Sequence, residues 1–172
     1  MRGPRDGEIG PDRPVDPDGD LELRIAEVGK AIRGRRSPTR YDARDLLILL
    51  GRRALDAEQG ESDSAVIAVA ERLRVAVEPW GEAWERAVEE ELALAAGEHV
   101  RSVDPRFLAH PRYDLAYTVG ARERLEARLV ACRLLGLDPP EALLDRIEEA
   151  DVALEPLLRG SEEPDAPPTK GA

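Results

Sequence analysis

Residues 41–58 read YDARDLLILLGRRALDAE, and the five consecutive apolar residues at positions 46–50 decide the fold. Such a run fits either a short buried strand or a helix that is apolar on nearly all sides. Good helix formers flank the run, and no neighbouring segment reads as a strand, so we predict a helix. A helix without a polar face must be covered by other helices, which places this one in the middle of a bundle.

The segments on both sides repeat apolar residues at the helical period of about 3.6 residues. This pattern predicts further helices over about 20–33, 63–78, 80–100, 113–135 and 138–160, with a short helical turn over 104–110. The apolar face expected for the helix over 80–100 comprises Trp80, Trp84, Ala87, Val88, Leu94 and Ala95. Because long helices joined by short links become antiparallel neighbours, the sequence predicts an all-α fold, a bundle of about six main helices.

Two helix boundaries carry clear signals. Gly136 follows the helix over 113–135 and is typical of the left-handed residue that ends a helix, with Leu137 as its apolar partner. The segment Asp138-Pro139-Pro140-Glu141 combines a capping residue, a proline and an acid, which predicts the start of the last helix. Leu143, Leu144, Ile147, Ala150 and Leu154 then repeat at helical spacing. We expect Pro156 to kink or end this helix near Gly160.

The two ends of the chain have a different composition. Residues 1–19 contain four prolines and almost no apolar side chains, and residues 161–172 are similar. Such segments bury too little apolar surface to offset the entropy of ordering. We therefore expect disordered tails at 1–19 and 161–172 around a single helical domain at 20–160.

The composition of the whole chain limits the class of protein. A net charge of −11 argues against a protein that coats nucleic acid or an anionic membrane. Cys132 is the only cysteine, which excludes a disulfide framework and fits a reducing compartment. The first residues lack the apolar stretch of a signal peptide, and no run approaches the roughly 20 apolar residues that span a bilayer. We expect a cytoplasmic protein, and the excess of Arg over Lys favours a bacterial source.

Charge is segregated along the chain. Residues 30–53 are strongly basic, whereas residues 61–98 are strongly acidic. Arg35, Arg36 and Arg40 lie in the link before the helix over 41–58, where guanidinium groups could bind carboxylates or phosphates. Three interpretations stay open for this link: a solvated loop, a docking point for an acidic protein, or a clamp for nucleic acid or phosphate.

Trp80 and Trp84 are one helical turn apart in a chain that is only 3% aromatic. Packing in the core is one interpretation. A partner-binding patch is the other, since Trp is enriched in the residues that dominate interface energies.

Glu91 and Glu98 fall on the apolar stripe of the helix over 80–100. A carboxylate on such a face needs a partner, because an unpaired buried charge is costly. The stripe could be exposed at that edge, or each Glu could pair with an arginine of a neighbouring helix, with Arg122 as a candidate. The third interpretation is a polar pocket inside the bundle, with His99 beside it.

Signals for catalysis are weak. His99 and His110 lack the Glu three residues earlier that helical metal sites use, and Cys132 has the position of a buried, inert thiol. We predict no cofactor, metal or catalytic residue.

The leading hypothesis is a non-enzymatic adaptor, regulatory or accessory subunit that binds a protein partner or itself, with no membrane partner. One alternative is a nucleic-acid- or phosphate-binding regulator using residues 33–53, although nucleic acid is the less favoured partner. The other is an enzyme or metal-binding bundle with a carboxylate pocket.

Overall fold

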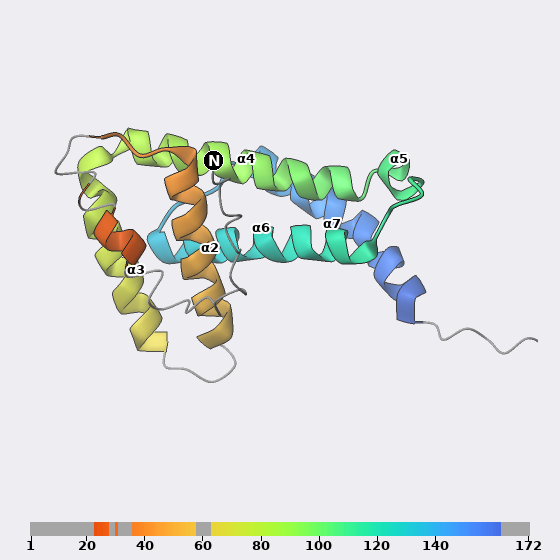
Figure 1. Cartoon of the computed structure of the whole chain (residues 1–172), viewed down its shortest axis with the longest axis horizontal. Helices are drawn as coiled ribbons and strands as arrows, with labels where there is room; N and C mark the ends of the chain where they lie inside the picture. Colours follow the sequence, from red (N-terminus) through yellow and green to blue (C-terminus); the bar gives the residue numbers. More distant parts are fainter. Residues whose placement is uncertain (1–22, 28–29, 31–35, 58–62, 163–172) are drawn as a thin grey trace, which may run out of the picture.

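The computed structural model describes residues 23–27, 30, 36–57 and 63–162. The predicted all-α fold is confirmed, because these ranges contain helices and no strand (Figure 1). The long helices are α2 (Arg40–Ala57), α3 (Asp63–Val77), α4 (Glu82–Ser102), α6 (Leu115–Leu135) and α7 (Glu141–Glu162). A 3₁₀ turn, Glu78–Trp80, joins α3 to α4, and the short helix α5 (Pro105–Leu108) lies between α4 and α6.

Part of the prediction lies outside the described residues. This holds for the tail at 1–19, for most of the tail at 161–172 and for most of the helix expected over 20–33, of which residues 23–27 are described and helical. At the other end, α7 continues through Glu162.

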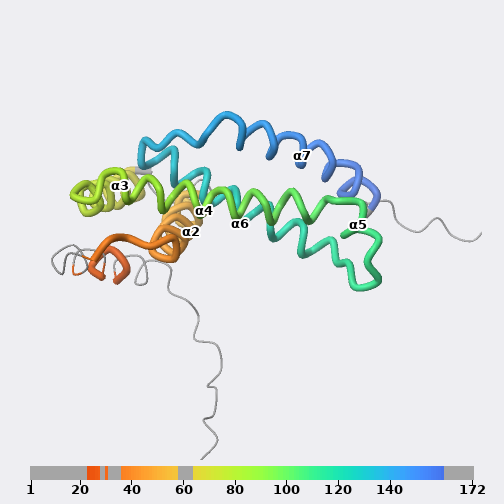
Figure 2. Tube along the Cα trace, turned by 90° about the horizontal axis from the view of Figure 1, so that it is seen from above, coloured from red at the N-terminus to blue at the C-terminus, as the bar shows by residue number. Residues whose placement is uncertain are grey.

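The antiparallel pair α4 and α6 forms the long axis of the molecule. In Figures 1 and 2, α2 crosses this pair on one side and α7 runs along the opposite side, while α3 lies near the start of α4. Helix α2 packs on α3, α4 and α6, as expected for a central helix, whereas α7 packs chiefly on α4. The side of α7 toward α6 is therefore sparsely covered.

Helices α2 and α6 cross in close contact. An added β-carbon on Gly51 would lie 1.7 Å from the carbonyl oxygen of Ala127. The two backbones thus touch at a position where α2 carries no side chain, and this contact brings α2 down onto α6.

The main core joins α2, α3, α4 and α6 to the first turns of α7, through Leu143 and Ile147. A smaller cluster lies farther along α7, with Val103, Ala150 and Leu154 as its buried members. One residue predicted on the apolar face of α4 is wrong: Leu94 is 48% exposed. Its place in the core of α4 is taken by Leu92 and Ala96, which are buried on the other side of the Trp84 stripe.

The predicted end of α6 is confirmed. Gly136 has a φ of 69°, and Leu137 N–H donates to the carbonyl of Cys132 at 2.9 Å, the bond that characterises a Schellman ending. The start of α7 differs, because the carbonyl of Pro140, two residues after Asp138, accepts the first helical bonds. A residue before proline avoids helical dihedrals, and Pro139 precedes Pro140, so the helix begins later. Pro156 lies inside α7 and does not end it.

Candidate protein-interaction surface

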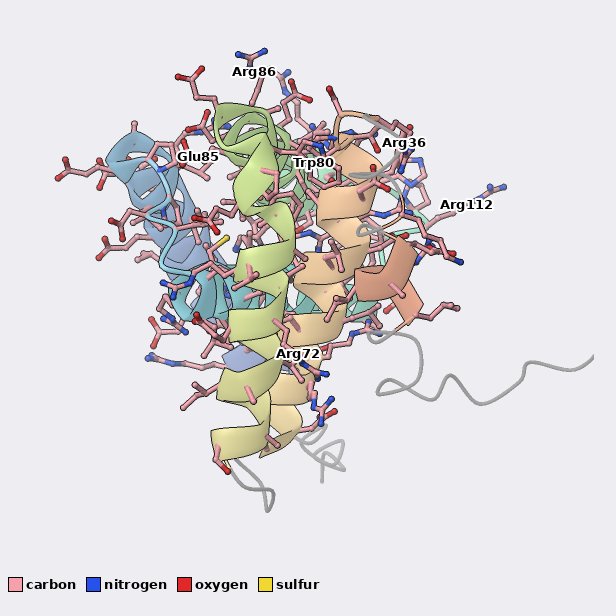
Figure 3. The ribbon with its side chains drawn as sticks, turned by 90° about the vertical axis from the view of Figure 1, so that its left-hand side faces the viewer. Arg36, Arg72, Trp80, Glu85, Arg86 and Arg112 are labelled. Atoms are coloured by element: carbon pink, nitrogen blue, oxygen red, sulfur yellow. The ribbon has the colours of Figure 1, made fainter. Side chains whose placement is uncertain are left out.

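The arginine link is engaged by nearby carboxylates. Arg35 lies outside the described residues. Arg36 pairs with Asp42 at 3.1 Å at the outer edge of the start of α2 (Figure 3). Arg40 lies 3.5 Å from Glu91 and stacks over the ring of the exposed Tyr41, 4.4 Å from its centroid. The side chain of Arg36 stays 59% exposed, whereas that of Arg40 is 29% exposed, so both arginines have a carboxylate partner but only Arg40 is largely covered.

The two tryptophans belong to the core more than to the surface. Trp84 is buried in the main core, and Trp80 packs against that core while staying partly exposed. Figure 3 shows Trp80 at the junction of α3 and α4. Of the two, only Trp80 keeps partial exposure.

Glu91 is buried in an ion cluster that ties three helices together. Glu91 is only 2% exposed to solvent. Nε and Nη2 of Arg128, on α6, both donate to Oε1 of Glu91, at 2.9 and 2.7 Å. Nη1 of Arg40, on α2, lies 3.5 Å from Oε2. Glu91 therefore has the arginine partners that a buried carboxylate needs, but Arg122 is not one of them.

Glu98 makes a separate and more exposed pair. Arg124 donates to its Oε1 at 2.7 Å, and the hydroxyl of Tyr117 donates to the same oxygen at 3.1 Å. Burial and the charge of Glu98 both raise the pKa of Tyr117, so this phenol stays protonated and donates.

His99 and Arg122 meet at Asp151 of α7. Nε2 of the fully buried His99 lies 2.8 Å from Oδ1 of Asp151, and Nε of Arg122 donates to the same oxygen at 2.7 Å. Arg122 also donates to Glu126 at 2.6 Å. Burial acts to lower the pKa of Arg122, but the hydrogen bonds to Asp151 and Glu126 outweigh it and raise the pKa.

The residues expected to share one polar pocket thus belong to three clusters. Glu91, Glu98 and His99 lie on α4, but each has its own partners on other helices. Among the described residues, no group reaches Nδ1 of His99 with a hydrogen bond. With 0% exposure, His99 cannot touch a substrate unless α7 moves.

A groove between α6 and α7 was not anticipated from the sequence. It is shallow and open to solvent, with a volume of about 720 Å³, and includes Arg122, Glu123 and Glu126 on the α6 side. The α7 side comprises Leu144, Ile147, Glu148, Asp151, Val152, Leu154, Glu155 and Leu158. Leu144 is 41% exposed and Val152 67%, so the core position expected for Leu144 is wrong.

A sequence signal for this groove existed. Leu143, Ile147, Ala150 and Leu154 alone form one complete apolar stripe on α7. The additional apolar residues, Leu144 and Val152, fall outside that stripe and so indicate a second contact surface.

The described ranges contain no group of three or more His, Cys, Asp or Glu side chains placed to hold a metal ion. No helix within them combines the length and apolar character needed to cross a bilayer. No protein-family model, curated protein or solved structure matches the chain.

Proposed function

We propose that this protein is a non-enzymatic helical adaptor or accessory subunit that binds a partner protein in the groove between α6 and α7. One observation carries this proposal: α7 packs chiefly on α4, and its apolar residues Leu144 and Val152 face an open groove beside α6. Exposed apolar side chains gathered in a groove are typical of interaction sites. We propose the bacterial cytoplasm as the setting, in keeping with the composition.

The dimensions of the groove fit a helical segment. From Leu144 to Leu158, α7 extends about 21 Å at roughly 1.5 Å per residue. A partner helix of about four turns covers that length. Grooves between helices commonly accept an amphipathic helix through its apolar face, and a fourth helix here would complete a bundle with α4, α6 and α7.

The two alternatives have less support. A nucleic-acid clamp needs available guanidinium groups, but Arg36 and Arg40 already have carboxylate partners, and the chain carries a net charge of −11. A bundle enzyme needs a reactive group that a substrate can reach, whereas His99 is enclosed.

A site-specific cross-linking experiment tests the adaptor proposal. A photo-reactive phenylalanine analogue is placed at Val152, in the groove, or at Ile67, an exposed apolar residue of α3. We expect a cross-linked protein from source cells with the Val152 probe, and we expect excess wild-type chain to abolish it. An excess of chain carrying Leu144→Ser should not abolish the cross-link. Equal capture by both probes, or no capture at Val152, would contradict the proposal.

A further inference from the structure

We infer that the segment bound in this groove is an amphipathic α-helix with a basic face; this inference rests on the proposed adaptor function. The charge of the groove carries it. Five carboxylates line the groove, at Glu123, Glu126, Glu148, Asp151 and Glu155, against the single guanidinium of Arg122. A bound segment must therefore supply positive charge, or leave the carboxylates that lack an arginine partner without counter-ions in a less hydrated site.

Internal ion pairs satisfy only part of this negative charge, and Arg133 also lies 3.7 Å from Glu126. Arg122 is shared between Asp151 and Glu126, and Glu155 pairs with Arg159 on its own helix. Glu123 and Glu148 make no ion pair with any residue that the structure describes. These two carboxylates, one on each side of the groove, are available to a Lys or Arg of a partner.

The order of residues along α7 says where the charges of the partner belong. Leu144, Glu148, Asp151, Glu155 and Leu158 follow one another at alternating spacings of four and three residues, so they share one stripe. Carboxylates occupy the centre of that stripe and leucines its ends. The complementary helix places basic side chains near its middle and apolar side chains toward both ends.

Charge also argues against a second copy of this chain as the occupant. Symmetric pairing through the groove would bring the α7 carboxylates of one copy against those of the other, because a twofold axis repeats the same patch. Like charges in contact are unfavourable, and each copy carries a net charge of −11.

Binding of designed peptides to the full chain tests the chemistry. Three labelled 18-residue peptides are compared by fluorescence anisotropy: an amphipathic Leu/Lys helix, the same pattern with Glu for Lys, and a scrambled Leu/Lys sequence. We expect the amphipathic basic peptide to bind and to weaken as salt rises, since exposed charges are screened within about 10 Å at 0.1 M salt. Equal binding of the scrambled peptide, or stronger binding of the acidic one, would overturn the inference.

Paired charge variants locate the contact. Glu123→Gln with Glu148→Gln removes two groove charges and should lower affinity for the amphipathic basic peptide by about two- to fivefold per lost ion pair. Glu89→Gln with Glu90→Gln removes the same charge from exposed positions of α4 outside the groove, and it should leave affinity within about twofold. An equal loss in both double variants would mean general attraction to an acidic chain and would refute groove binding.

The segment captured by the Val152 probe separates this inference from the adaptor proposal. A cross-linked segment that is helical and rich in Lys or Arg supports both. A segment that is acidic or uncharged, or a second copy of this chain, overturns the basic-helix inference and leaves the adaptor proposal standing. No capture at Val152 above the Ile67 control, together with no peptide binding, overturns both.

Discussion

Gly51 of α2 and Ala127 of α6 are in backbone contact, so that an added β-carbon on Gly51 would lie 1.7 Å from the Ala127 carbonyl oxygen. Glycine within a helix costs about 0.5–1 kcal/mol relative to alanine. Here that cost is offset by the close approach of the two helices, which buries Leu47 and Leu50 beside the contact.

Gly51→Ala should therefore destabilise the protein although alanine is the better helix former. The neighbouring atoms belong to the backbone of Ala127 and cannot rotate away. We therefore expect the free energy of unfolding to fall by more than about 3 kcal/mol, at the upper end of overpacking costs. Urea unfolding measures it. Gly97→Ala is the matched control, since its nearest atom is Nη1 of the flexible Arg101 side chain at 3.5 Å. Gly97→Ala should be neutral or stabilising by up to about 1 kcal/mol, and similar losses for both variants would contradict the close contact.

Removing one partner of the Glu91–Arg128 pair should be costly. Arg128→Met leaves the buried carboxylate of Glu91 with only Arg40 nearby. We expect the free energy of unfolding to fall by about 3–5 kcal/mol. Adding Glu91→Leu should recover most of it, because no buried charge is then left unpaired. Glu98→Gln, at the half-exposed pair with Arg124, should cost less than about 1 kcal/mol. Additive losses in the Glu91/Arg128 double variant would show that the pair is not coupled.

Asp151 holds α7 to both neighbouring helices through His99 and Arg122. Asp151→Ala should speed amide hydrogen exchange in α7 while exchange in α2, which does not contact this cluster, changes little. Glu149→Ala, an exposed change on the same helix, should leave both unchanged. Uniform acceleration across the chain would mean that α7 does not open as a separate unit.

The thiol of Cys132 should be unreactive in the folded protein. Burial raises its pKa to about 12 from an ordinary value of 9.0, so almost no thiolate exists at pH 8. We expect no labelling by iodoacetamide until denaturant is added. The same shift lowers the free energy of unfolding as pH rises between about 9 and 12, because only the unfolded thiol ionises there. Rapid native labelling would show that Cys132 becomes accessible.

The arginine link provides a test of the nucleic-acid alternative. We expect duplex and single-stranded oligonucleotides to bind no tighter than the non-specific range of about 10⁻⁴ to 10⁻⁶ M at physiological salt. Anisotropy titrations measure this. Sub-micromolar binding that Arg36→Ala weakens would favour the nucleic-acid regulator over the adaptor.

The helices were predictable because their signals are local, but the partners of Glu91 and Glu98 were not. Apolar spacing and Gly136 act within a few residues of chain. To predict that Glu91 pairs with Arg128, and Glu98 with Arg124, one must know how α4 and α6 are aligned along their lengths. The residue numbers of the pairs Glu91–Arg128, Glu98–Arg124 and Ser102–Thr118 each add up to about 220, as in a hairpin folded at its connecting loop. That rule would have excluded Arg122 as the partner of Glu91, but not as the partner of Glu98, because 98 and 122 also add up to 220.

The error at Leu94 and the missed groove have another cause. At roughly 100° per residue, Leu94 lies about 80° around the helix from Trp84. It therefore falls at the edge of the apolar face of α4. Which edge is covered depends on where other helices pack, and the sequence pattern of α4 does not contain that information. The same holds for α7, because its packing chiefly on α4 leaves Leu144 exposed.

Pro156 gives the two ends of α7 different mechanical properties. It has no N–H to donate to the carbonyl of Val152, so the helix has one backbone bond fewer at that level. Bending there disrupts less structure than elsewhere along α7. The opposite end is anchored in the main core by Leu143 and Ile147. We therefore expect the groove to be stiffer near Leu143 than near Leu158, so that a partner bound in the proposed way would meet a compliant end where side chains of different size could fit.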